Sequence, residues 1–113
     1  MFKIATNPTY KTKVTVDILG DNGKTTSTVF TAIFKRQSQS ELDNMTDRLN
    51  AKELLDRDLI SEVMVGWGDV ADASGTPLEF NDENLDALLD VHPVRPTIVK
   101  AYFASLNGAK AKN

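Results

Sequence analysis

His92 is the residue best suited to acid–base chemistry, because it is the only histidine in the chain and imidazole titrates near neutral pH. The chain has no cysteine to act as a nucleophile or zinc ligand, and no serine lies in a G-x-S-x-G elbow. His92 directly precedes Pro93, a position typical of a helix end. We therefore expect no enzymatic activity, no cofactor and no metal site.

Two groups of carboxylates have residue types that bind divalent cations. Asp58 and Glu62 share a helix face, but Asp56 lies two residues from Asp58, about 200° around a helix. The run from Asp69 to Gly75 resembles a calcium loop, yet Ala71 stands where a second ligand is needed. Both groups are typical of a solvated surface.

Residues 66–71, Gly-Trp-Gly-Asp-Val-Ala, match a loose form of the dinucleotide-binding fingerprint. That fingerprint requires a preceding strand and a following helix, whereas here a helical pattern precedes it and a Ser/Gly/Pro loop follows. Thirteen basic and 16 acidic residues give a net charge of −3, which argues against nucleic acid and anionic membranes as partners. The N-terminus lacks a signal-like apolar core, and the longest strongly apolar run is Val63–Val65, so we expect a cytoplasmic protein.

The N-terminal third predicts an antiparallel β-hairpin. In residues 11–20 the apolar side chains alternate at Val14, Val16 and Ile18, and residues 24–36 are rich in Thr, Val, Ile and Phe. The Gly-Asp-Asn-Gly sequence between them suits a tight turn. An isolated hairpin is marginal in water, so this one must pack on the helices that follow, on a third strand from residues 1–5, or on another copy.

Residues 38–65 have helical periodicity. Ser38 or Ser40 can cap the helix, with Glu41 or Asp43 completing a capping box. The first apolar stripe consists of Leu42, Met45 and Leu49, and the second of Leu55, Leu59, Ile60, Val63 and Met64. The pattern is compatible with one helix over 41–65 or with two, ended by Gly66 and Gly68.

The remaining chain predicts a loop over 68–80 with a turn at Ser74-Gly75, followed by two helices. Asn81 caps the first, whose apolar residues are Leu85, Leu88 and Leu89. The second starts near Pro96 and ends at Gly108. The expected fold is α+β in a single domain over 1–113: a hairpin or small sheet in 1–37, three to four helices in 38–108, and a flexible tail in 109–113.

The last helix has an unusually wide apolar stripe. Its members are Val99, Tyr102, Phe103 and Leu106, with Ile98 beside them. Most aromatic side chains in so small a chain belong to the core, which favours a core position for Trp67 and Phe103. The hairpin and this stripe together nevertheless predict more apolar surface than one monomer covers, so self-association or a helical partner would cover it.

Several short segments, in this order, resemble the small tail assembly chaperones of long-tailed bacteriophages. They are the Thr/Val-rich hairpin ending in Phe34-Lys35-Arg36, Ser40–Asp43, Val65-Gly66-Trp67, Asn81–Leu85, Ile98–Tyr102, and Leu106–Lys110 before a Lys-Asn end. The most specific parts are Val65-Gly66-Trp67 and the region from Lys100 to the Lys-Asn end. The resemblance spans nearly the whole chain.

The resemblance implies a non-enzymatic protein of the infected host cytoplasm that is absent from the finished virion. Similar proteins coat the long, aggregation-prone tape measure protein until tail tube subunits polymerise around it. Partner contact then falls on Trp67, Val99, Tyr102, Phe103 and Leu106, although core packing predicts the same stripe.

Two further expectations remain open. Many similar proteins also have a longer form made by ribosomal frameshifting, and Ala111-Lys112-Asn113 can be encoded by a slippery GCA-AAA-AAC sequence. The competing class is a structural subunit of the virion, a tail tube or head–tail connector protein. Tube subunits are usually richer in strand than this sequence.

Overall fold

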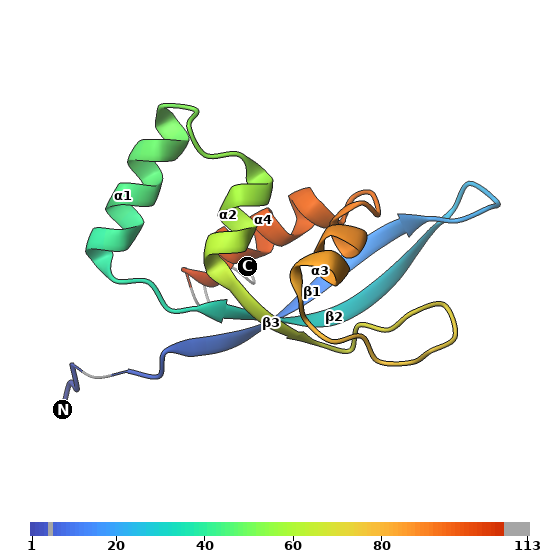
Figure 1. Ribbon diagram of the computed structural model, residues 1–113, viewed down its shortest axis with the longest axis horizontal. Helices are drawn as coiled ribbons and strands as arrows, with labels where there is room; N and C mark the ends of the chain where they lie inside the picture. The colour runs from blue at the N-terminus through green and yellow to red at the C-terminus, as the bar shows by residue number, and fades with distance from the viewer. Residues whose placement is uncertain (5, 108–113) are drawn as a thin grey trace.

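The computed structural model describes residues 1–4 and 6–107 and has the expected α+β architecture (Figure 1). A three-stranded antiparallel sheet is combined with four helices. The expected closing residue Gly108 and the tail 109–113 lie outside the described residues.

The predicted hairpin is present as β1 (Thr9–Leu19) and β2 (Thr25–Lys35). The register pairs Val14 with Phe30 and Thr12 with Ala32, which places the alternating apolar side chains on one face. Gly23 has a positive φ of 82° in the connecting turn, a conformation that glycine adopts without strain. The turn chemistry and the strand alternation therefore agree.

The third strand is β3 (Met64–Gly68), which pairs antiparallel with β2 in the sheet order β1-β2-β3. The prediction that the helix extends to Val65 is wrong, because residues 64–68 form this strand. Residues 1–4, which belong to the other segment considered for a third strand, contain no strand. Met64 and Gly66 are buried and Val65 between them is exposed, the period of a strand. A Cβ at Gly66 would lie 3.2 Å from Cδ1 of Ile33, so the glycine accommodates close packing against β2.

Residues 39–63 form two helices, α1 (Gln39–Asn50) and α2 (Asp56–Val63). Ser38 is the N-cap of α1, and its hydroxyl accepts from the Glu41 amide at 3.1 Å while the Glu41 carboxylate accepts from the Ser38 amide at 3.0 Å. This is the capping box, built on Ser38 rather than Ser40. Lys52 follows α1 with a φ of 59°, a left-handed conformation that ends the helix.

The predicted turn at Ser74-Gly75, in the loop after β3, is present, and so are both C-terminal helices. The carboxylate of Asp72 accepts from the amides of Ser74 and Thr76. Helix α3 (Asp82–Leu89) is capped by Asn81 as predicted. Helix α4 (Val94–Ser105) starts two residues before the predicted Pro96. Pro96 still lies in the first turn, where no amide donor is needed.

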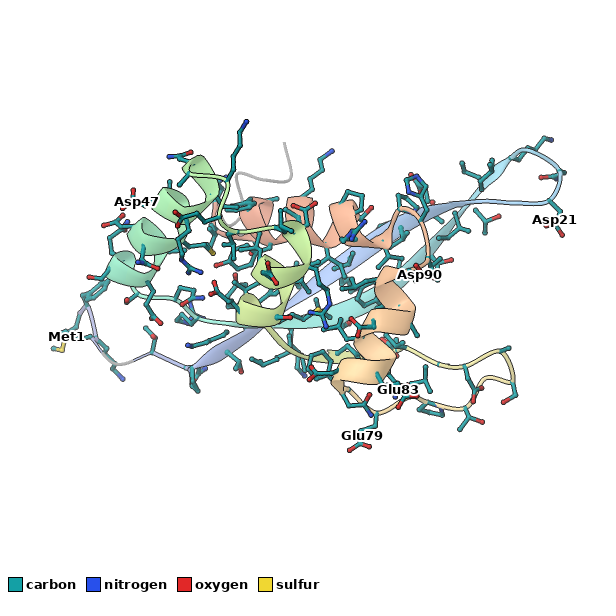
Figure 2. All side chains as sticks on the ribbon, turned by 45° about the horizontal axis from the view of Figure 1, so that its top comes forward. Met1, Asp21, Asp47, Glu79, Glu83 and Asp90 are labelled. Atoms are coloured by element: carbon teal, nitrogen blue, oxygen red, sulfur yellow. The ribbon has the colours of Figure 1, made fainter. Side chains whose placement is uncertain are left out.

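The helices gather on one side of the sheet (Figure 1), with α4 in contact with β1 and α2 in contact with β2 and β3. The core between these layers contains Phe30, Ala32 and Phe34 from the sheet and Leu59, Ile60 and Ile98 from the helices. The carboxylates labelled in Figure 2, among them Asp47, Glu83 and Asp90, lie at the periphery. Within residues 1–4 and 6–107, no helix combines the length and apolarity needed to cross a membrane.

Candidate functional site

The residues considered for chemistry lie on different elements: His92 between α3 and α4, Glu62 on α2, and Asp72 in the loop after β3. His92 is exposed beside Pro93, and Glu62 forms an ion pair with Arg48. Asp72 is used within its own turn, where hydrogen bonds from Ser74 and Thr76 hold the pKa of its carboxyl below the usual range. In the described part of the chain, no three His, Asp or Glu side chains are placed to share a metal ion.

The predicted apolar stripe of α4 divides into two rows. Val94, Ile98 and Tyr102 are buried at spacings of four residues. Val99, Phe103 and Leu106 form an adjoining row at i, i+4 and i+7, and we call it the α4 outer stripe. Val99 and Phe103 are half-buried and Leu106 is 43% exposed. The outer stripe is therefore the apolar part of α4 that a partner can reach.

Tyr102 belongs to the core. It is 1% exposed, and its ring lies edge-on to that of Phe34 with 5.1 Å between the centroids. Its hydroxyl has no hydrogen-bond partner among the residues that the structure describes. Burial raises the pKa of this phenol to about 12, with a smaller contribution from nearby Tyr10.

Trp67 has a structural partner as well. Its indole Nε1 donates to the carbonyl oxygen of Leu78 at 2.9 Å, and its ring lies edge-on to Phe80 at 5.0 Å. These contacts tie the segment that leads into α3 to β3. Trp67 is nevertheless only part-buried.

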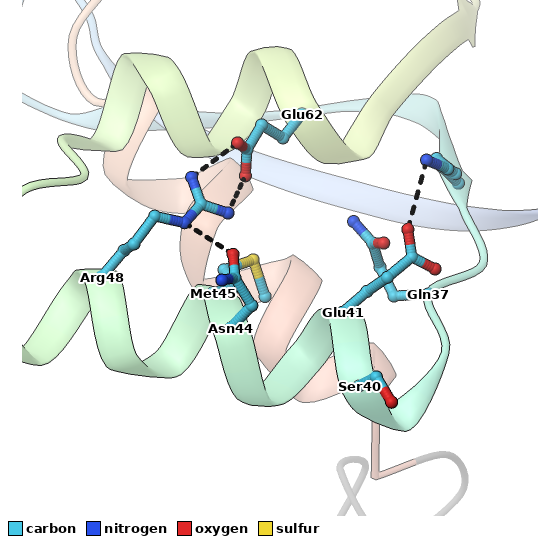
Figure 3. Close-up of a pocket in the computed structure, with 8 residues that line it drawn as sticks. Gln37, Ser40, Glu41, Asn44, Met45, Arg48 and Glu62 are labelled. Carbon is cyan, nitrogen blue, oxygen red and sulfur yellow. Dashed lines mark hydrogen bonds and ion pairs between the residues drawn. The ribbon is translucent and has the colours of Figure 1, made fainter.

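A cavity between α1 and the rest of the molecule was not predicted from the sequence (Figure 3). It measures about 510 Å³ and is lined almost entirely by polar side chains, with Met45 as the apolar exception. Arg48 crosses from α1 to α2 and donates to both carboxylate oxygens of Glu62, at 2.7 and 3.0 Å. These bonds raise the pKa of the Arg48 guanidinium above its usual range.

The sequence pattern could have indicated α1 and α2 as neighbours, since each has an apolar stripe, but not this ion pair. Arg48 and Glu62 are 14 residues apart, and their pairing depends on how the 51–55 connection bends. Leu55 in that connection is 68% exposed, although the periodicity assigned it to an apolar stripe. Its exposure follows from its position at the N-cap of α2.

The comparisons with known proteins give one positive result. A family model described as phage tail assembly chaperone matches residues 1–113, the whole sequence. No curated protein and no solved structure matches the chain. With the match extending over every element described above, the chain belongs to the phage tail assembly chaperone family.

Proposed function

We propose that this chaperone binds the tape measure protein of its phage, keeps it soluble, and helps to recruit tail tube subunits. The role is non-enzymatic and is carried out in the host cytoplasm, before the chaperone leaves the assembling tail. Family membership supports a role in tail assembly. The α4 outer stripe is the observation that carries the choice of an apolar helical partner.

Val99 and Phe103 lie along one face of α4, and Leu106, the C-cap residue just after the helix, extends this apolar strip. A strip of this kind can pack against the apolar face of another helix. Trp67, which is part-buried on β3, is a second candidate contact. Tyr102 supports the outer stripe from the core, because its ring packs against Phe103 with 5.4 Å between centroids.

The net charge of −3 supports a solubilising role. A protein that covers apolar surface on another chain must itself present a charged exterior, or the complex associates further. The exposed carboxylates of α3 supply such an exterior.

Co-expression with the tape measure protein encoded in the same genome tests this function. We expect the tape measure protein to become soluble and to co-purify with the chaperone. If the tape measure protein stays insoluble and the chaperone alone forms tubes or rings, the chain is instead a structural subunit.

Leu106→Asp and Leu19→Asp form a matched pair for locating the contact. Both leucines are exposed, at 43% and 69%, so neither substitution removes core packing. Leu106→Asp places a charge in the α4 outer stripe and is expected to reduce co-purification. Leu19→Asp, at the far end of the hairpin, is expected to have no effect. If both variants lose co-purification equally, the α4 outer stripe is not the contact site.

A further inference from the structure

Helix α1 is attached to the molecule differently from α2 and α4. Each of those two helices buries three side chains: Leu59, Ile60 and Val63 on α2, and Val94, Ile98 and Tyr102 on α4. Helix α1 buries Met45 and leaves Leu42 and Leu49 half-buried. Because apolar burial is the main source of tertiary stability, α1 is held more weakly than the other two.

Polar contacts add to the apolar contacts of Leu42, Met45 and Leu49. On the α2 side the Arg48–Glu62 ion pair spans the polar cavity, and at the start of α1 the ammonium of Lys35 lies 3.5 Å from the Glu41 carboxylate (Figure 3). These side chains are between 32% and 50% exposed. Ion pairs at such positions contribute little to stability and are screened by salt.

The helix itself is stabilised from within. Its capping box satisfies donors at the N-terminus. Gln39 donates to Asp43, and Arg48 to Asn44, each pair four residues apart along the helix. These local bonds favour the helical conformation of α1, but 12 residues are too few for a stable helix in water without tertiary contacts.

We propose that α1 is a displaceable cover over a helix-binding surface, and that an amphipathic helix of a partner protein takes its place. Because α1 seats Leu42, Met45 and Leu49 on this surface, the incoming helix carries apolar residues at i, i+3 and i+7. Because release of Arg48 leaves Glu62 without its cation, that helix also carries a Lys or Arg facing Glu62. The proposal rests on the proposed function for the partner, but the opening of α1 is testable without it.

The natural absence of cysteine allows opening to be measured with single cysteines. Met45→Cys and Ile60→Cys place thiols at positions 1% and 0% exposed, on α1 and α2. The rate of reaction with a thiol reagent under native conditions reports how often each site opens. We expect Cys at position 45 to react at least about tenfold faster than Cys at position 60. If Ile60→Cys does not fold, Val63→Cys, 1% exposed, replaces it.

Charge substitutions then test the contact that holds α1. Arg48→Glu in the Met45→Cys background places two carboxylates together and should speed labelling by about three- to fivefold. The double substitution Arg48→Glu/Glu62→Arg restores an ion pair and should return the rate to its original value. None of these changes should alter labelling at position 60. Equal rates at positions 45 and 60 in the parent, or no response to Arg48→Glu, would overturn the proposal.

Capture of the tape measure protein tests the identity of the occupant. Arg48→Glu and Glu62→Arg both open α1, but only the second removes the carboxylate offered to the partner. We expect Arg48→Glu to increase capture and Glu62→Arg to decrease it. If both variants increase capture, the prediction that the incoming helix carries a Lys or Arg facing Glu62 is wrong. If α1 opens as expected in the thiol experiment but capture is the same in all variants, the surface under α1 does not bind the partner. Capture itself would still support the proposed function.

A stable dimer of Arg48→Glu would show that α1 exchanges between copies of this chain. That result would overturn the proposal that the occupant is a helix of a partner protein.

Discussion

Helices α1 and α4 each have 12 residues, yet they are stabilised by different means. Helix α1 has a capping box and polar side-chain pairs along its surface. Helix α4 has no side-chain N-cap bond and is held by three buried side chains against β1, α2 and α3. The helix with the better local sequence is thus the one with the weaker tertiary attachment. The two helices therefore depend on different kinds of interaction.

Phe34→Ala should reduce the free energy of unfolding most, because it removes a buried contact of α4. Phe34 is fully buried and its ring contacts those of Tyr10 and Tyr102. Truncating a buried phenylalanine costs about 3–5 kcal/mol of unfolding free energy. Urea denaturation followed by Trp67 fluorescence measures it. A loss below about 1 kcal/mol would mean that α4 does not depend on this contact.

Ser38→Ala should have a smaller effect, confined to α1. Loss of an N-cap hydroxyl costs about 1 kcal/mol, and amide hydrogen exchange in α1 should accelerate accordingly while exchange in α4 is unchanged. Ser40→Ala is the matched control, since Ser40 lies in the same turn and does not cap the helix. Equal acceleration in both variants would argue against the capping box as the cause.

Tyr102→Phe should leave stability unchanged or raise it by up to about 1 kcal/mol, because the buried hydroxyl has no partner among the described residues. Its pKa is about 12 in the folded protein, against an ordinary value of 10.0 for this side chain. The folded state therefore holds this proton more tightly than the unfolded state does. The resulting contribution to the free energy of unfolding is present below about pH 10 and is lost as the pH rises towards 12. Unfolding curves for both proteins across this range measure the difference. A variant that loses as much stability as the parent would show that Tyr102 is not the group responsible.

Arg48→Ala should have the smallest effect on global unfolding, because its ion pair with Glu62 is partly exposed. The same substitution should still increase hydrogen exchange in α1, and salt should reduce the difference between parent and variant. A large fall in the denaturation midpoint would place α1 within the main cooperative unit instead.

The strands of the hairpin, the Ser38 and Asn81 caps and the turn near Ser74 were predictable, because each depends on residues close in sequence. Strand β3 was not. Met64 continues the apolar stripe of α2, and only the pairing with β2 shows why Gly66 is needed beneath Ile33. Tertiary pairing overrode the local helical pattern here.

The apolar stripe of α4 was predictable as a stripe but not as two rows. Val99 and Tyr102 have the same periodic signal, and only the position of the sheet makes one half-buried and the other part of the core. The cavity under α1 depends on the bend at residues 51–55, which places Arg48 against Glu62. Neither arrangement is encoded in residue spacing alone.

Native-state hydrogen exchange under increasing urea tests the difference between α1 and α4 most directly. We expect α1 amides to exchange through a local opening of low free energy that depends weakly on urea, while α4 amides exchange only through global unfolding. If α1 and α4 exchange with the same free energy and the same dependence on urea, they belong to one cooperative unit, and α1 is not a displaceable helix.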